Sequence, residues 1–200
     1  MMSGAYHEEN EVRESMGLRL AETEDLPEIR RMFEGVIAWM DGAGIRIWDE
    51  VYPSAAFPAD IDNRRLYLLE DGGEMLGAFA LSAEDESCGR MGWEKREAGA
   101  LYLERLAVSA AHPRQGIGKR LIRQAAALAR DRGAEYLRLL VVDYNRTAIR
   151  LYEKCGFRRA EGLFDKPLGE DLILHEFGYE LELAHGLCPA ETYYSNPQKY

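Results

Sequence analysis

Cysteine is scarce in this sequence: only Cys88, Cys155 and Cys188 occur among 200 residues. The three are widely spaced, form no C-x-x-C pair, and have no histidine at the spacing of a zinc ligand. An odd number of thiols also fits no closed set of disulfides. We therefore expect reduced thiols and no metal site.

Long apolar runs are missing as well. No uncharged apolar stretch approaches the ~20 residues that a membrane-spanning helix needs. The first residues carry Glu8, Glu9, Glu11 and Glu14, whereas a secretory signal starts with basic residues and continues with an apolar stretch. These features predict a cytoplasmic protein that does not associate with membranes.

Positive charge is in deficit, and the formal net charge is −10. Binding to nucleic acid depends mainly on Lys and Arg that neutralise phosphates, so this balance opposes a nucleic-acid partner. Cationic small molecules or basic peptides suit an acidic surface better.

The length of 200 residues fits one domain. We place this domain at residues 17–185, between an acidic tail of residues 1–16 and a C-terminal tail of residues 186–200. Local patterns predict helices over 23–41, 58–64, 116–132 and 145–155, and strands over 18–21, 65–70, 75–81, 100–108, 136–142, 157–164 and 172–183. The expected fold class is mixed α/β, with a central mixed, mostly antiparallel sheet flanked by helices.

Residues 101–119, LYLERLAVSAAHPRQGIGK, run from a strand through a glycine turn into an amphipathic helix. Gly116 and Gly118 allow a tight turn, and the unpaired N–H groups of the first helical turn favour an anion such as a diphosphate. In the alternative, the glycines only relieve crowding. The segment is not a nucleotide P-loop, because Arg120 stands at the hydroxyl position, nor a dinucleotide fingerprint, because Leu121 replaces the third glycine.

A second segment, residues 145–157, reads NRTAIRLYEKCGF. Together and in this order, the two segments resemble the two cofactor-binding motifs of the GNAT superfamily of acetyltransferases. The resemblance covers residues 101–158, and the strand, helix and hairpin before it follow the order found in that family. It implies an N-acetyltransferase with acetyl-CoA as cosubstrate.

The resemblance also implies a coenzyme A site built largely from backbone groups. The turn amides that would cradle the pyrophosphate are those of Arg114, Gln115, Gly116, Ile117, Gly118 and Lys119. The pantetheine would pair with the backbone of Leu106, Ala107 and Val108, where the fourth and fifth strands, 100–108 and 136–142, splay apart. Asn145 would bond the pantetheine, and Tyr152 would lie near the sulfur. Pro113 departs from the Arg or Gln often found at its position and offers no N–H to a phosphate.

Tyr152 is the candidate catalytic acid. Attack of an amine on a thioester expels a thiolate, which benefits from a nearby proton donor such as a tyrosine hydroxyl. The alternative interpretation makes Tyr152 a core aromatic on the helix face that carries Ala148, Leu151 and Cys155.

Glu104 is the candidate base that takes the amine proton, a role that an ordered water could also fill. Side chains repeat every two residues along a strand, which puts Glu104 on the face of Leu106 and Val108. The alternative is an ordinary strand carboxylate paired with Arg105 or Arg138.

The acceptor amine has candidate ligands between the first helix and the hairpin. Trp48, Asp49 and Tyr52, with Glu50 beside them, combine aromatic rings and carboxylates that can hold a cationic amine. The same region lines the acceptor side in GNAT enzymes. A solvated acidic loop with two anchoring aromatics is the alternative.

These observations predict transfer of acetyl from acetyl-CoA to a primary amine of a small molecule or peptide. Direct transfer is expected, because no histidine base lies near Cys155 in the sequence. A longer acyl-CoA donor, a non-catalytic acetyl-CoA sensor and a purely structural α/β module are the alternatives, and a homodimer is one option for assembly.

Overall fold

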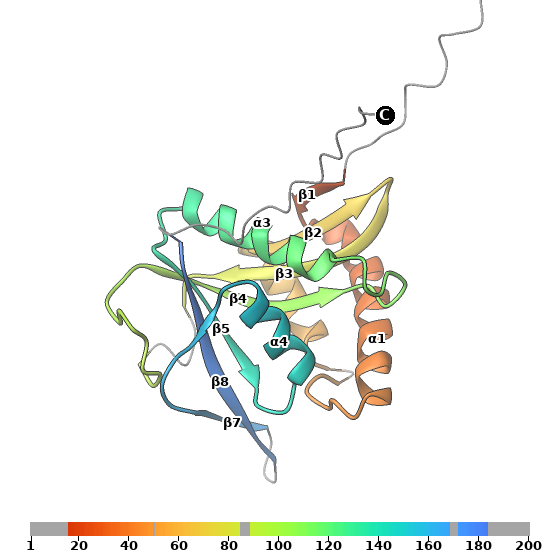
Figure 1. Cartoon of the computed structure of the whole chain (residues 1–200). Coiled ribbons are helices and arrows are strands. Elements are labelled where there is room, and N and C mark those ends of the chain that lie inside the picture. The colour runs from red at the N-terminus through yellow and green to blue at the C-terminus, as the bar shows by residue number, and fades with distance from the viewer. Residues whose placement is uncertain (1–15, 50, 85–88, 169–171, 184–200) are drawn as a thin grey trace, which may run out of the picture. The chain divides into compact units, whose positions relative to one another are not determined.

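The computed structural model of the chain describes residues 16–49, 51–84, 89–168 and 172–183. They form two compact units, the first from residues up to Ser82 with Leu103–Leu121, the second from Ala83–Tyr102 with the residues from Ile122 onward. Figure 1 labels most of their helices and strands. The predicted tails lie outside the described residues, apart from Met16, so the domain limits 17–185 stay a prediction.

Antiparallel strands form the sheet of the first unit. β1 (Gly17–Leu20) pairs with β2 (Leu66–Asp71), and β2 pairs with β3 (Glu74–Ser82). The turn between β2 and β3 has Gly72 and Gly73 at φ 56° and 81°, which glycine adopts without strain. The predicted hairpin is confirmed. β4 (Ala100–Val108) lies beside β3 in the sheet.

Helices cover this sheet and enclose the core of the first unit. The predicted start of the first helix is a 3₁₀ turn, η1 (Thr23–Asp25), held by the Asp25 carboxylate, which accepts from the Glu22 N–H at 2.7 Å. α1 (Leu26–Gly42) follows, and its buried residues recur at the predicted helical spacing: Ile29, Phe33, Val36 and Met40. After η2 (Ser54–Ala56), α2 (Phe57–Asp62) adds Phe57 to the same core.

The sheet of the second unit is built around β5 (Tyr136–Val142). The start of β4, Ala100–Tyr102, pairs with β5 in parallel, and β8 (Leu172–Glu182) pairs with β5 antiparallel. β6 (Arg158–Arg159) and β7 (Phe164–Leu168) both pair with β8. The single strand predicted over 157–164 is wrong, because the chain pairs with β8 in two separate stretches.

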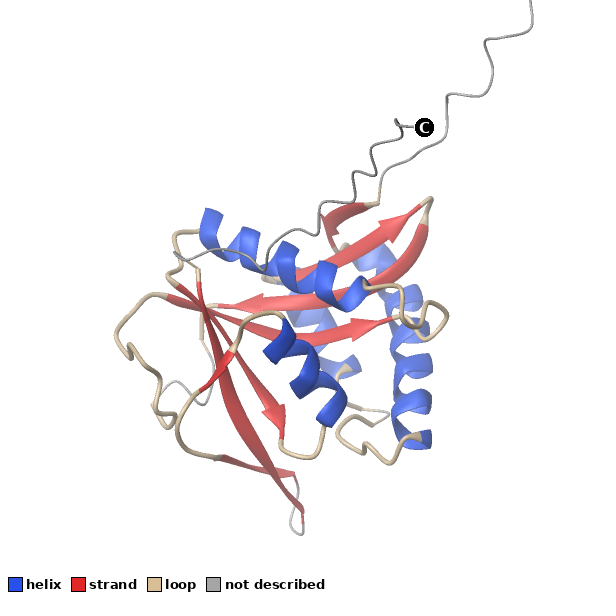
Figure 2. Cartoon of the chain, viewed as in Figure 1, coloured by secondary structure: helices blue, strands red, loops and turns tan. Residues whose placement is uncertain are grey.

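Two helices belong to the second half of the chain. α3 (Ile117–Asp131) begins in the first unit and ends in the second, and Gly133 follows it at φ 80°. α4 (Arg146–Lys154) connects β5 to β6 in the sequence. Figure 2 shows the helices in blue and the strands in red. None of the helices among the described residues is long and apolar enough to cross a membrane.

The strand order of the eight-stranded sheet is β1-β2-β3-β4-β5-β8-β6, with β7 beside β8. The mixed α/β class and the mostly antiparallel sheet with one parallel pair are confirmed. The parallel pairing of β4 with β5 joins Ala100–Tyr102 to 136–138 and, among the described residues, goes no further. Short pairing is what a splayed junction would produce, and the splay itself stays a prediction.

A buried ion pair anchors the loop before β4 in the second unit. The Arg138 Nε donates to Glu180 Oε2 at 3.2 Å, and its Nη2 donates to the Lys95 carbonyl at 2.7 Å. The same guanidinium lies 4.9 Å from the Trp93 ring centroid. Because Arg138 and Glu180 are almost fully buried, each charge depends on the other for compensation.

Candidate coenzyme A and acceptor site

The glycine turn before α3 has the geometry of an anion cradle. Arg114 and Gly116 both adopt left-handed backbone angles, φ 61° and 75°, two residues apart. Alternation of this kind points successive N–H groups toward one side of the chain and makes a concavity that binds anions. Arg114 pays a steric cost for this conformation, whereas Gly116 does not.

The first turn of α3 adds further donors at the same place. Its first backbone hydrogen bond, as described in the structure, runs from the Arg120 N–H to the Gly116 carbonyl at 3.1 Å. The N–H groups of Ile117, Gly118 and Lys119 therefore precede the helical hydrogen-bond ladder and are oriented along the helix axis. A helix N-terminus with such donors favours a negatively charged group.

Contacts within the first unit fix the end of β4 against β3. The Ser109 N–H donates to the Leu76 carbonyl at 2.9 Å, and His112 Nε2 lies 2.8 Å from Glu74 Oε1. A Cβ on Gly77 would lie 2.5 Å from the Ala107 carbonyl oxygen, so β3 approaches the backbone of the predicted pantetheine strand as closely as glycine permits. These contacts set the position of Leu106–Val108 relative to the turn.

Asn145 precedes α4 as its N-cap. Its Oδ1 accepts a hydrogen bond from the Ala148 N–H at 3.2 Å, as expected of asparagine at a helix start. The residue predicted to bind pantetheine thus has a structural role in this conformation. A ligand contact would use its side-chain amide hydrogens, which are donors.

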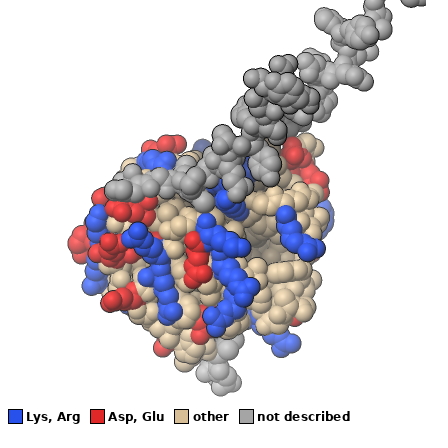
Figure 3. Space-filling view, viewed as in Figure 1, with Lys and Arg blue, Asp and Glu red and all other residues tan. Residues whose placement is uncertain are grey.

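Arginine and lysine line the exposed side of α4, although the whole chain is acidic. Arg146, Arg150 and Lys154 are exposed and recur every four residues, so they share one stripe of the helix. Figure 3 shows basic side chains running across the face that carries this helix. Local positive charge on α4 is compatible with an anionic ligand.

Tyr152 is buried on α4 together with Ile149. Its ring packs against Phe157 with centroids 5.8 Å apart. Burial, with a smaller contribution from Cys155, raises the pKa of the Tyr152 hydroxyl well above its ordinary value of 10.0. The hydroxyl is therefore protonated at neutral pH and can act only as a donor of its proton. Both the core interpretation and the acid role are compatible with this position.

Glu104 is paired with its neighbour in β4. Its Oε2 lies 2.6 Å from Arg105 Nη2, so of the two arginines considered from the sequence, Arg105 is the one found beside it. Arg105 has φ 51°, a left-handed conformation inside a strand. Burial nevertheless alternates from Glu104 to Val108, because Glu104, Leu106 and Val108 are half-buried whereas Arg105 and Ala107 are buried. The role of Glu104 as a base stays a prediction.

The predicted acceptor residues follow α1 and are only partly available to a ligand. Trp48 packs against Phe33 with ring centroids 5.4 Å apart. Asp49 Oδ1 accepts from the N–H groups of Val51 and Tyr52 at 2.8 Å and 2.7 Å, so the carboxylate shapes its own loop. Tyr52 is 37% exposed. Glu50 lies outside the described residues.

In the sequence analysis, Arg105 was not connected with this loop, and Asp60 was missed. The Tyr52 hydroxyl accepts from Arg105 Nη1 at 3.5 Å, and Arg105 in turn contacts Asp60, which is fully buried on α2. Asp60 lies three residues after Phe57, on the same buried face of a short helix. A carboxylate at such a position predicts a buried cationic partner.

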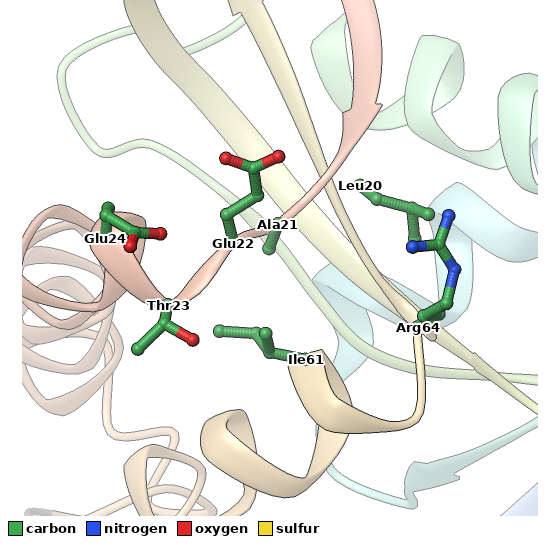
Figure 4. Close-up of a pocket in the computed structure, with 7 residues that line it drawn as sticks. All are labelled: Leu20, Ala21, Glu22, Thr23, Glu24, Ile61 and Arg64. Carbon is green, nitrogen blue, oxygen red and sulfur yellow. The ribbon is translucent and has the colours of Figure 1, made fainter.

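A separate pocket of about 340 Å³ lies in the first unit. Figure 4 shows its lining: Leu20, Ala21, Glu22, Thr23, Glu24, Ile61 and Arg64. None of these residues was predicted to bind the cofactor or the acceptor. Among the described side chains, no cluster of histidine, cysteine or carboxylate could hold a metal ion.

The mixed sheet, the glycine turn and the asparagine-capped helix together define the architecture of a GNAT-type α/β protein. The model of the acetyltransferase (GNAT) family matches residues 32–157, more than half of the chain. The chain belongs to this family, which confirms the resemblance seen in its two motifs.

Named relatives share parts of the chain. Streptothricin acetyltransferase of Streptomyces lavendulae is 35% identical over 98 residues, which cover 49% of this chain and 46% of that protein. Thialysine N-epsilon-acetyltransferase of Sus scrofa is 40% identical over 65 residues, 31% of this chain and 38% of that protein. The chain thus spans less than half the length of these relatives.

This chain shares its fold with a solved structure over nearly the whole length of that structure. A protein from Salmonella typhimurium, solved with its cofactor acetyl-CoA, has a TM-score of 0.59 and 18% identity to this chain. The alignment covers 88% of this chain and 99% of that one.

Proposed function

We propose that this protein is an N-acetyltransferase that moves the acetyl group of acetyl-CoA to a primary amine of a small molecule or peptide. The observation that carries the proposal is the left-handed turn at Arg114 and Gly116, which opens directly onto the N-terminus of α3. Its backbone donors fit the pyrophosphate of coenzyme A. Membership of the GNAT family supports the same cosubstrate.

In the proposed complex, Arg114 through Lys119 hold the pyrophosphate through their backbone N–H groups. The backbone of Leu106, Ala107 and Val108 pairs with the pantetheine, and Asn145 donates a side-chain hydrogen bond to it. Binding through the main chain explains why glycine is needed at the turn, because side chains would keep the ligand away from the N–H groups.

The proposed reaction is a direct transfer. The neutral amine forms a bond to the thioester carbonyl carbon, and the carbon–sulfur bond breaks. Tyr152 donates its proton to the departing thiolate, and Glu104 or a water accepts the proton that the amine loses. Tyr152 carries its proton at neutral pH when the thiolate forms, and the raised pKa makes it a weaker acid than an exposed tyrosine.

The proposed acceptor binds beside Trp48, Asp49 and Tyr52. Asp49 and Tyr52 are exposed and Trp48 is half-buried, and an aromatic face attracts a cationic amine before it loses its proton. The relatives named for streptothricin and thialysine support an amine acceptor. We further propose that the protein acts in the cytoplasm, and a homodimer stays an option.

A CoA-release assay tests the activity. Acetyl-, propionyl- and succinyl-CoA would be combined with amino acids, polyamines, aminoglycosides and peptide N-termini. Turnover highest with acetyl-CoA is expected. Preference for a longer donor would replace the acetyl assignment, and binding of acetyl-CoA without turnover on any acceptor would favour a sensor.

A pair of glycine variants tests the site. Gly116 and Gly133 both have positive φ, 75° and 80°, and an added Cβ meets no heavy atom within 4 Å at either position. Each change to alanine should therefore cost a similar ~1 kcal/mol of stability through the backbone alone. Only Gly116→Ala is expected to weaken acetyl-CoA binding. Equal affinity in the two variants would contradict the proposed cradle.

A further inference from the structure

A carboxylate with no solvent exposure is held between two arginines in the first unit. Asp60 on α2 is 0% exposed. Its Oδ1 accepts from Arg65 Nε at 2.5 Å and from Arg105 Nη2 at 3.1 Å, and its Oδ2 lies 2.7 Å from Arg105 Nε. Two cations around one buried anion compensate its charge, so the cluster is fixed in place rather than free to rearrange.

Arg105 extends from this buried anchor to two residues of the proposed site. Its Nη2 lies 2.6 Å from Glu104 Oε2, and its Nη1 donates to the Tyr52 hydroxyl at 3.5 Å. One planar guanidinium thus touches the candidate base, the exposed acceptor-loop tyrosine and the buried carboxylate. A rigid fork of donors can hold three partners in one geometry, which a single ammonium cannot do.

The backbone at Arg105 is strained to allow this arrangement. Its φ of 51° is uncommon for a residue other than glycine, and it occurs inside β4. Burial alone would lower the pKa of Arg105, but the charges of Glu104 and Asp60 more than offset burial and raise the pKa above its ordinary value. Arg105 is therefore always positively charged, and its backbone is in a strained conformation. Its contacts with Asp60, Glu104 and Tyr52 stabilise the charge and the strained backbone.

We propose that Arg105, anchored by Asp60, is a positioning residue that sets the Glu104 carboxylate and the Tyr52 hydroxyl relative to each other. This role rests on the proposed transferase function. Loss of the anchor lets the carboxylate and the acceptor loop move independently, so the amine is less often bound with its proton directed at the base. The proposed pyrophosphate contacts of Arg114 through Lys119 and the proposed contact of Asn145 lie on other segments of the chain, and no hydrogen bond or ion pair described in the structure joins those residues to this anchor.

Three variants test the role. Arg105→Lys keeps the charge without the fork, Asp60→Asn weakens the anchor, and Arg105→Asn removes the charge with a residue that tolerates left-handed angles. The matched control is Glu180→Gln, which weakens the other buried arginine–carboxylate pair, with Arg138. Steady-state kinetics with varied acceptor, acetyl-CoA affinity by calorimetry and thermal midpoints would be measured for each.

The expected result is a fall in kcat over acceptor KM of about tenfold or more in the Arg105 and Asp60 variants, with acetyl-CoA affinity within about twofold of wild type. Glu180→Gln should lower the thermal midpoint and leave the kinetics of the folded enzyme unchanged. Variants of Arg105 and Asp60 that match the control in both respects would overturn the positioning role.

A double-mutant cycle distinguishes positioning from general packing. If Arg105 acts through Glu104, then Arg105→Lys in a Glu104→Gln background should lower kcat much less than it does in the wild type. Additive effects would overturn the role. Absence of wild-type turnover on every acceptor would instead overturn the proposed function, and the positioning role with it, so the two failures are distinguishable.

Discussion

The Oδ1 of Asn145 accepts a hydrogen bond from the Ala148 N–H at 3.2 Å, so the residue proposed to bind pantetheine also begins helix α4. One side chain can serve both purposes because an amide has an acceptor at one atom and two donors at the other. The cap uses the acceptor, which leaves ligand binding to the donors.

Substitution of Asn145 separates the two roles. Asn145→Asp keeps a capping oxygen but loses the donors, so stability should be retained while acetyl-CoA affinity falls. Asn145→Ala loses both, and its free energy of unfolding should fall by about 1 kcal/mol. Thermal melts and calorimetry with acetyl-CoA measure the two effects. Unchanged affinity in Asn145→Asp would restrict Asn145 to capping.

Alanine at Gly77 should destabilise the first unit. The added Cβ would lie 2.5 Å from the Ala107 carbonyl oxygen and 2.8 Å from Leu121 Cδ1, and the backbone atom cannot easily give way. We expect a loss of about 1–3 kcal/mol in the free energy of unfolding, measured by urea denaturation.

Gly35→Ala is the control for Gly77→Ala, and it should change the stability in the opposite direction. Gly35 lies on the exposed side of α1, and its added Cβ would meet nothing within 4 Å. Gly35→Ala should therefore stabilise the protein by about 0.5–1 kcal/mol, because alanine loses less entropy in a helix. Effects of the same sign in both variants would contradict the packing described at Gly77.

Activity should not fall through ionisation of Tyr152 below pH 10. Its pKa is raised above the ordinary value of 10.0, so the protonated form that donates persists as pH rises to that value. Tyr152→Phe should lower kcat by about tenfold or more with little change in acetyl-CoA affinity. The ratio of wild-type to Tyr152→Phe kcat should stay constant from about pH 6 to about pH 9. A ratio that falls with pH in this range would show that Tyr152 loses its proton early.

Acid should weaken the contact between β1 and the start of α1. Hydrogen bonds from Arg19 lower the pKa of Asp25 below its ordinary 3.8. The stabilisation is therefore present above pH 3.8 and is lost as pH falls through the lower folded-state pKa. Arg19 is 41% exposed, so solvent screening keeps the effect small.

Asp25→Asn tests this dependence by urea denaturation at several pH values. The stability difference from wild type should be constant near neutrality and should shrink in acid below the ordinary pKa of the carboxyl group. Asp62→Asn, at an exposed position at the end of α2, is the control and should show a smaller difference throughout. A difference for Asp25→Asn that grows in acid would contradict the direction of the shift.

Local patterns in the sequence were sufficient to predict most helices and strands. The turn at Gly72 and Gly73, the buried periodicity of α1 and the strand before the glycine turn all depend on residues close together in the chain. The single strand predicted over 157–164 was wrong because its pairing depends on residues that are distant in the chain. These residues lie in β8, and between the two paired stretches Gly162 turns the chain at φ 97°.

In the candidate site, too, some features could be predicted from neighbouring residues and others depend on contacts between distant residues. The motif around Gly116 allowed the cofactor region to be predicted from the sequence, because a backbone cradle needs specific residues at consecutive positions. From the sequence, Glu104 was either a catalytic base or a strand carboxylate paired with Arg105 or Arg138. The structure places Arg105 beside it, whereas Arg138 on β5 pairs with Glu180, its register partner on β8.

The sequence by itself determined the family, the fold class and the position of the glycine turn proposed to bind an anion, because these follow from short-range patterns of glycine, periodicity and capping. Only the tertiary structure brought Asp60, from α2, to Arg105 on β4 and Tyr52 in the loop after α1. Those contacts join residues that are distant in the chain, and they exist because a buried charge must find an opposite charge wherever the fold supplies one.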